Sequence, residues 1–88
     1  MTILATKPRA KSMPVAATGV RFTHTMVVVA LNDGREIGIP LSRLPWLAQA
    51  TNQQRARWSV EPHGYAVWWD DLDDGLEVCH LLDMQVLG

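Results

Sequence analysis

The side chains that could carry out chemistry are few and scattered along the chain. Cys79, the single cysteine, directly precedes His80, and the other histidines are His24 and His63. Adjacent side chains point to opposite faces of a strand and lie about 100° apart around a helix, so Cys79 and His80 are poorly placed to act as nucleophile and base. We therefore expect Cys79 to be a small core residue and His63, which lies beside Gly64 in a predicted turn, to be exposed.

An acidic run, Asp70 to Asp74, is the first candidate for a metal site. A calcium loop of the EF-hand type needs oxygen ligands at alternating positions, a glycine at the sixth and a glutamate at the twelfth. Counted from Asp71, the fifth position is Gly75 and the twelfth is Leu82, while counting from Asp70 places Leu72 third. The template fails in both registers. We predict a solvated loop, with a non-standard Ca²⁺ or Mg²⁺ site as the alternative, and its partners would come from Arg35, Arg55 or Arg57.

No other recognised catalytic pattern is present in the sequence. The serines at positions 12, 42 and 59 belong to no recognisable Ser–His–Asp motif, and there is no glycine-rich phosphate-binding loop. Four carboxylates on a loop should be well hydrated, whereas a general acid needs a desolvated carboxyl group. We predict that the protein is not an enzyme and uses no cofactor or metal.

Size and composition indicate one globular domain. The chain has 88 residues, of which 48% are apolar and 19% charged. Its longest apolar run, Met26 to Leu31, has six residues, far short of the roughly 20 that a membrane span needs. The single cysteine excludes an internal disulfide, and the N-terminal residues do not resemble a secretory signal. We therefore expect a cytoplasmic protein with no membrane partner.

Charge is divided unevenly between the two halves. Residues 1–57 contain all eight Lys and Arg and two acids, a net charge of +6, whereas residues 58–88 contain seven acids and neither Lys nor Arg, a net charge of −7. In one small domain the two halves would fold together and neutralise each other, which is the interpretation we favour. The alternative is a nucleic-acid contact through basic residues of the first half, namely Lys7, Arg9, Lys11, Arg43 and Arg57.

The order of patterns along the chain predicts an α+β domain. Residues 1–17 are expected to be a flexible basic arm, and residues 18–88 a single domain. Strands are predicted around 20–22, 26–31, 36–39, 58–61 and 65–69, and residues 76–82 fit a strand that turns into a short helix. Asp33-Gly34 predicts a hairpin turn. Residues 41–57 should form an interrupted helical segment, in which Thr51 and Gln54 match a capping box. We expect an antiparallel sheet of four or five strands with this short helical segment between strands.

Four tryptophans in so short a chain supply both core volume and interaction anchors. Trp68 and Trp69 are adjacent in a predicted strand, so they should face opposite sides of the sheet. We predict protein contacts through Trp46 and through Trp68 or Trp69, because an exposed tryptophan among charges is typical of an interaction hot spot. Arg55 is predicted to order the Asp70–Asp74 loop by ion pairing.

In their order, several short motifs resemble the DUF2442 family of small prokaryotic proteins. They lie within residues 18–83 and comprise Asp33-Gly34-Arg35, Ile39-Pro40-Leu41, Leu44-Pro45-Trp46-Leu47, Ala50-Thr51-Asn52-Gln53-Gln54-Arg55, Gly64, Trp69, Leu72-Asp73 and Leu81-Leu82. The chain departs from the family pattern at Asp70, where proline is usual, and at Gly75, where an acid is usual. The resemblance implies the α+β fold with an antiparallel sheet and no assigned function.

Two functions follow as predictions. The first is a small non-enzymatic protein-interaction module. Its partner is expected to be another small protein, encoded next to it as the resemblance implies, or a second copy of the chain. The alternative is an antitoxin-like or transcription-regulatory component that contacts DNA directly or through a partner, since some relatives carry a helix-turn-helix domain and some are encoded in arrangements that look like toxin–antitoxin pairs.

Overall fold

The computed structural model describes residues 15–87, with side chains described up to Leu82. The expected basic arm therefore lies mostly outside the described residues, and so do Lys7, Arg9 and Lys11. The first strand includes Ala17, which is buried. Within residues 15–87 none of the helices combines the length and the apolar composition needed to cross a bilayer.

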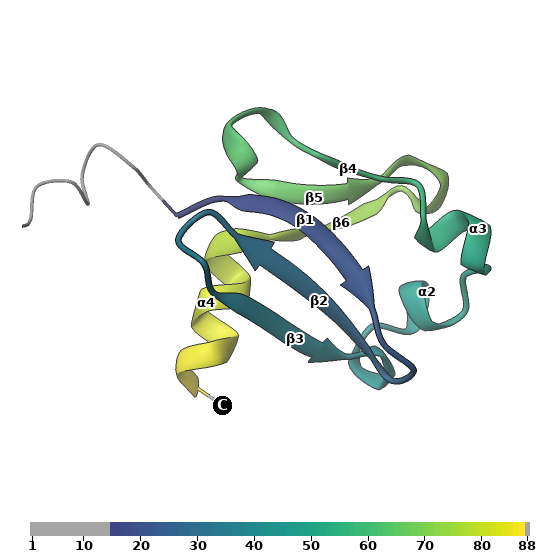
Figure 1. Ribbon diagram of the computed structural model, residues 1–88. Coiled ribbons are helices and arrows are strands. Elements are labelled where there is room, and N and C mark those ends of the chain that lie inside the picture. Colours follow the sequence, from purple (N-terminus) through teal and green to yellow (C-terminus); the bar gives the residue numbers. More distant parts are fainter. Residues whose placement is uncertain (1–14, 88) are drawn as a thin grey trace, which may run out of the picture.

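In the described residues, six strands are interspersed with short helical elements, and a longer helix follows the last strand (Figure 1). In chain order they are β1 (Ala17–Phe22), β2 (Met26–Leu31), β3 (Glu36–Pro40), the 3₁₀ turn η2 (Leu41–Arg43), α2 (Pro45–Ala48), α3 (Asn52–Arg55), β4 (Trp58–Val60), η3 (Pro62–Gly64), β5 (Ala66–Trp69), η4 (Asp70–Leu72), β6 (Asp74–Glu77) and α4 (Val78–Leu87).

The strands form two antiparallel sheets of three strands each, in the orders β1-β2-β3 and β4-β5-β6. The α+β class is confirmed, but the expectation of one sheet with four or five strands is wrong. Strand β3 ends at Pro40, which has no N–H to continue a ladder, and the helical segment then carries the chain away from it. The second half consequently pairs with itself, through the hairpins β4-β5 and β5-β6.

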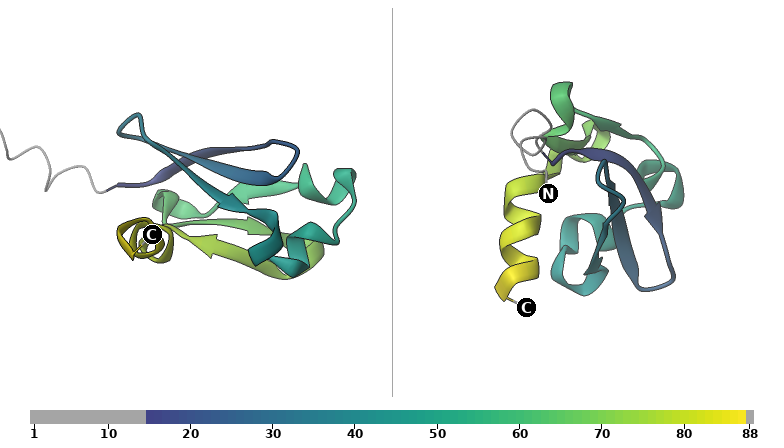
Figure 2. Two further views of the ribbon diagram at one scale, coloured as in Figure 1. Left: turned by 90° about the horizontal axis from the view of Figure 1, so that it is seen from below. Right: turned by 60° about the vertical axis from the view of Figure 1, so that its left-hand side comes forward.

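The core lies between the two sheets, which form two layers when seen from below (Figure 2). Each sheet presents alternate residues inward, as the period of two requires. In the first sheet Val27 pairs with Ile39, and Val29 with Ile37, so all four side chains are buried together. The remaining buried members of this core are Ala17, Leu31, Leu41, Leu47, Val67, Trp69, Leu76, Val78 and Leu81.

The hairpin turn between β2 and β3 confirms the prediction from Asp33-Gly34. Gly34 has φ 93°, a value that L side chains rarely adopt and that glycine adopts without steric cost. Asp33 Oδ1 accepts a hydrogen bond from the backbone N–H of Arg35 at 3.0 Å, and Asp33 Oδ2 accepts one from Arg35 Nε at 2.8 Å. The backbone N–H and the guanidinium together lower the pKa of Asp33. The turn thus fixes the register that buries β2 and β3.

The helical segment is interrupted, as predicted, and its second helix begins with the predicted capping box. Thr51 Oγ1 accepts from the backbone N–H of Gln54 at 3.0 Å, and Gln54 Oε1 accepts from the backbone N–H of Thr51 at 2.9 Å. Two N–H groups at the helix start are satisfied in this way. The segment is anchored by Leu47, which is fully buried.

Candidate functional site

The second sheet turns one tryptophan inward and the next outward. Along β5, Val67 and Trp69 are buried in the core, whereas Ala66 and Trp68 lie on the opposite face and remain partly exposed. The alternation of the pleat produces this division. The prediction that Trp68 and Trp69 face opposite sides of the sheet is therefore confirmed, and Trp68 is the accessible member of the pair.

Small residues on both neighbouring strands support the Trp68 ring. Trp68 lies opposite Ser59 of β4 and Gly75 of β6. A Cβ atom at Gly75 would lie 2.5 Å from Trp68 Cε3 and 2.5 Å from the Val67 carbonyl oxygen, so the indole rests directly against the glycine backbone. A side chain at position 75 would therefore require the indole or the backbone to shift.

Acidic side chains surround Trp68. It lines a shallow depression of about 430 Å³, which we call the Trp68 groove, formed by Glu61, Ala66, Trp68, Asp74, Gly75, Glu77 and His80. Glu61 and Glu77 are exposed, and Asp74 Oδ1 accepts the backbone N–H of Gly75 at 2.8 Å. An aromatic face beside three carboxylates favours a cationic ligand, because the quadrupole of the ring and the carboxylates both attract positive charge.

The sequence pointed to Trp68 through the Trp68-Trp69 alternation and placed Asp74 in a nearby acidic run, but it did not indicate that Glu61 and Glu77 lie at the same groove. Glu61, Asp74 and Glu77 come from three different strand ends, and the pairing of Ala66 with Glu77 brings one of them to the groove. That pairing depends on the register of β5 against β6, which the sequence pattern did not determine.

The other two predicted tryptophan anchors are part of the core packing. Trp69 is fully buried, and its Nε1–H donates to the carbonyl oxygen of Arg55 at 3.0 Å. Trp46 is partly buried and meets Trp69 edge to face, with ring centroids 5.6 Å apart. Phe22 makes a similar contact with Trp69 at 6.5 Å. Trp69 therefore presents no surface to a partner, whereas Trp46 stays partly exposed, as Trp68 does.

Arg55 does not pair with the acidic loop, so that part of the prediction is wrong. Its Nε donates to the carbonyl oxygen of Leu47 at 3.1 Å and its Nη2 to that of Ala48 at 2.9 Å. Its guanidinium also lies 5.6 Å from the centre of the Phe22 ring. Both carbonyls lie in the last turn of α2, and the Leu47 carbonyl oxygen also accepts from the backbone N–H of Ala50 at 3.2 Å. It joins the helical segment to the first sheet.

Arg57 is the residue that holds the acidic loop, as the wider prediction allowed. Its Nη1 lies 2.9 Å from Asp71 Oδ2, and both side chains are substantially exposed. The loop itself folds as the 3₁₀ turn η4, and Asp73 closes it with φ 52°. The acidic run is therefore a structured turn tied to the segment that precedes β4.

Of the residues predicted for nucleic-acid contact, two lie in the described part. Arg43 is exposed at the end of η2, and Arg57 is engaged by Asp71. Two further arginines also pair with carboxylates, Arg21 with Glu36 at 2.9 Å and Arg35 with its neighbour Asp33. Hydrogen bonds from Arg21, together with its charge, lower the pKa of Glu36.

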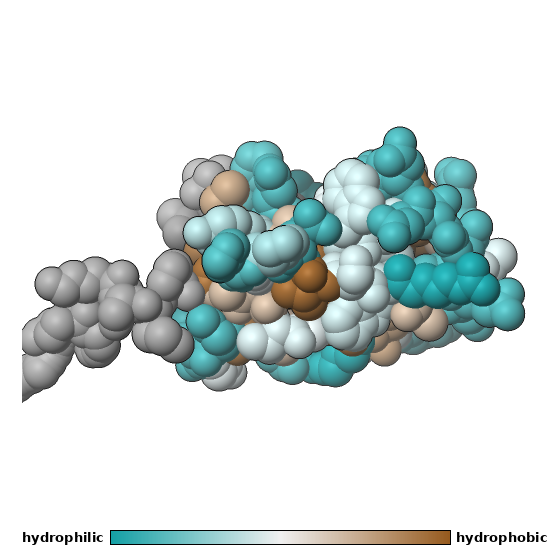
Figure 3. All heavy atoms as spheres, turned by 90° about the horizontal axis from the view of Figure 1, so that it is seen from above, coloured by the Kyte–Doolittle hydropathy of each residue, from teal (hydrophilic) through white to brown (hydrophobic). Residues whose placement is uncertain are grey.

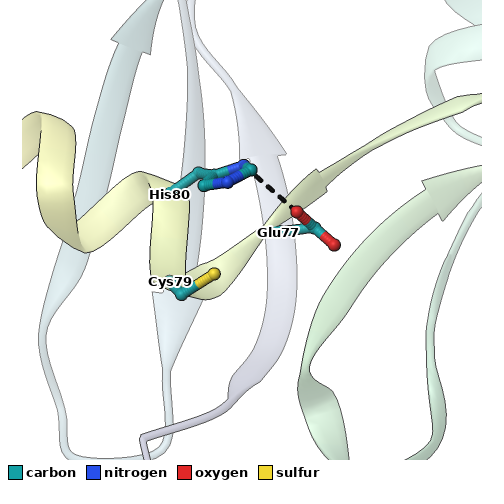
Figure 4. A group of neighbouring side chains, drawn as sticks. All are labelled: Glu77, Cys79 and His80. Carbon is teal, nitrogen blue, oxygen red and sulfur yellow. Dashed lines mark ion pairs between the residues drawn. The ribbon is translucent and has the colours of Figure 1, made fainter.

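A cluster of three potential metal ligands was missed by the sequence analysis. Glu77, Cys79 and His80 are all exposed, and their ligand atoms lie within 4.8 Å of one another. His80 Nδ1 is 3.1 Å from Glu77 Oε1, as the dashed line shows (Figure 4). The expectation that Cys79 is a core residue is wrong. The boundary between β6 and α4 at Val78 turns Val78, rather than Cys79, into the core.

Comparisons with known proteins agree with the family resemblance. The model of the family described as protein of unknown function (DUF2442) matches residues 17–83. No curated protein matches the chain. A crystal structure of a protein of unknown function from Rhodospirillum rubrum ATCC 11170 is similar in fold, with a TM-score of 0.67 and 24% sequence identity over 80% of this chain and 87% of that one. Because the family model spans most of its length, this chain belongs to the DUF2442 family.

Proposed function

We propose that the protein is a non-enzymatic interaction module that binds a positively charged segment of another protein in the Trp68 groove. The observation that carries this proposal is the position of Trp68, an accessible indole at the centre of an outer sheet face with Glu61, Asp74 and Glu77 around it. A Lys or Arg side chain over the indole would gain a cation–π contact and an ion pair at once.

The groove is prepared for binding. Gly75 lies against the Trp68 ring, and this contact restricts the positions that the ring can take. Binding costs less when the side chains involved are ordered beforehand. Aromatic residues with few rotatable bonds are favoured in binding surfaces for the same reason.

Charge also supports a basic partner. Residues 58–82 contain six acids and neither Lys nor Arg, and three of these acids line the groove. An acidic surface attracts a basic partner before contact and speeds its association, an effect that weakens as salt is added. On the face over β4, most of the surface belongs to hydrophilic residues or to residues of intermediate hydropathy (Figure 3). A partner that contacts this face would be recognised through polar contacts and charge more than through a broad apolar area.

Affinity capture with matched variants tests the proposal. Tagged wild-type protein and the variants Trp68→Ala, Glu61→Gln and Glu36→Gln would be exposed to lysate of the source organism after nuclease treatment, and retained proteins identified by mass spectrometry. Glu36→Gln is the control, because it removes an exposed carboxylate from the other sheet. The proposal predicts one protein with a Lys- or Arg-rich segment, retained in stoichiometric amount by wild type and Glu36→Gln, and lost or strongly reduced with Trp68→Ala and Glu61→Gln.

Two results would overturn this assignment. Equal retention of the same proteins by all four baits would place the binding surface elsewhere. Retention of nucleic-acid-associated proteins alone, abolished by nuclease, would favour the antitoxin-like or regulatory alternative. That alternative also predicts salt-sensitive retention of the purified chain on a polyanion column.

A further inference from the structure

The group formed by Glu77, Cys79 and His80 goes beyond the proposed function, and we propose that it binds a zinc ion at the surface of the domain. The three residues offer a carboxylate oxygen, a thiolate sulfur and an imidazole nitrogen, which are the ligand types that Zn²⁺ takes in proteins. Their ligand atoms already lie within 4.8 Å of one another. Tetrahedral zinc bonds of about 2.0–2.3 Å to N, O and S place ligand atoms about 3.3–3.8 Å apart, so side-chain rotations would have to draw the three atoms together around the ion.

The backbone holds these three side chains on a rigid corner. Glu77 is the last residue of β6, and Cys79 and His80 belong to the first turn of α4 (Figure 4). The N–H of Val78 donates to the Tyr65 carbonyl oxygen at 2.9 Å, which ties the corner to the second sheet. Val78 and Leu81 are buried in the core on the inner side of the same turn. Sites carried by such fixed elements hold their ligands more precisely than sites on loops.

The existing contact within the cluster already orders two of the ligands. His80 Nδ1 lies 3.1 Å from Glu77 Oε1, so both groups point to the same place without a metal. A zinc ion would replace this ion pair, and the His80 imidazolium and the Cys79 thiol would each release a proton to solvent as the Zn–N and Zn–S bonds form. Three protein ligands leave the fourth tetrahedral position for a water molecule, because the cluster is exposed.

The acidic surroundings favour a cation at this corner. Glu77 and His80 also line the Trp68 groove, together with Glu61 and Asp74. Two carboxylates beyond the ligands themselves therefore add to the attraction of a divalent ion. Oxygen ligands alone would suit Ca²⁺ or Mg²⁺, but sulfur and imidazole select zinc and its transition-metal neighbours over these hard ions.

Cobalt titration of the reduced, tag-free full chain tests the site, since Co²⁺ takes the same tetrahedral ligands and reports them by its absorption. The proposal predicts one ion per chain, a thiolate-to-metal charge-transfer band, and displacement of Co²⁺ by Zn²⁺ but not by Mg²⁺. Cys79→Ser should abolish the band. Glu77→Gln and His80→Ala should each weaken binding by about tenfold or more, while His24→Ala, an exposed histidine in the turn between β1 and β2, should leave it unchanged.

Absence of a thiolate band in the wild-type protein would overturn the proposal. So would a band whose titration midpoint is the same in His80→Ala and Glu77→Gln as in wild type, because Cys79 would then bind the metal by itself. All three ligands are exposed, so circular dichroism should show the variants to be folded. The readout does not involve a protein partner, and the result is therefore independent of the interaction assigned to the Trp68 groove.

Discussion

Trp69 joins three parts of the fold at one buried ring. It packs edge to face against Trp46 and Phe22, and its Nε1–H satisfies the Arg55 carbonyl. We predict that Trp69→Phe lowers the free energy of unfolding by about 2 kcal/mol, because it removes core volume and a hydrogen bond together. Urea unfolding followed by circular dichroism measures this change. Unchanged stability would show that the ring does not hold these parts together.

Two arginines close in sequence should differ in their effect on stability. Arg55 donates to two carbonyl oxygens at the end of α2, whereas Arg57 makes one exposed ion pair with Asp71. We expect Arg55→Ala to lower the free energy of unfolding by about 1–2 kcal/mol, and Arg57→Ala by less than about 0.5 kcal/mol. Thermal and urea unfolding of both variants would decide. The reverse ranking would contradict this account, because the exposed ion pair between Arg57 and Asp71 would then stabilise the fold more than the Arg55 hydrogen bonds do.

The turn residue Asp33 should make stability depend on pH. Its pKa is lowered in the folded protein by the Arg35 N–H and guanidinium, so the carboxylate form is favoured on folding. Its contribution is therefore present above the unfolded pKa, near pH 4, and disappears as pH falls through the lower, folded pKa. Asn at this position keeps an acceptor for the N–H but carries no charge. The stability advantage of wild type over Asp33→Asn should shrink as pH falls below about 4; a constant difference would contradict this.

At the scale of elements, the capping box is the device that starts α3. Helices of four residues have little intrinsic stability, so the two reciprocal hydrogen bonds between Thr51 and Gln54 matter. Thr51→Ala should lower the free energy of unfolding by about 1 kcal/mol, while Thr51→Ser should retain most of it. Urea unfolding of the two variants provides the comparison. Equal losses would mean that packing of the segment, and not the cap, sets its position.

The sequence was most informative where structure is local. The Asp33-Gly34 turn, the Thr51 capping box and the opposite facing of Trp68 and Trp69 each depend on a few neighbouring residues, and all are present. Whether the strands form one sheet or two depends on pairing between distant segments, which periodicity does not specify. The helical segment separates β3 from β4, and the strands before and after it form separate sheets.

Side-chain partners were predicted less well, because they depend on tertiary approach. Arg55 and Arg57 differ by two positions, and only the path of the chain brings Arg57 to Asp71 and Arg55 to the carbonyls of α2. The burial of Cys79 was mispredicted for a similar reason. A shift of one residue in where α4 begins exchanges Val78 and Cys79 between core and surface.

For the whole molecule, the division of charge has two consequences. Among the described residues one ion pair, Arg57 with Asp71, connects the basic first half to the acidic second half, whereas Arg21 and Arg35 pair with acids of their own half. Three other acids of the second half, Glu61, Asp74 and Glu77, line the Trp68 groove. Binding of a basic partner there should weaken several-fold between about 0.05 and 0.5 M salt, as screening shortens the range of charge attraction. Salt-independent affinity would contradict an electrostatic contribution.

The most direct measurement of the central claim is site-specific photocrosslinking in living cells. Ser59 is exposed and lies opposite Trp68 on the outer sheet face, whereas Ser42 is exposed in η2. With p-benzoylphenylalanine at position 59, the account predicts a crosslink to a Lys- or Arg-rich segment of one protein. The same group at position 42 should give none. Crosslinks from position 42 alone, or none from position 59 while the partner is still captured, would contradict the assignment of the Trp68 groove as the binding surface.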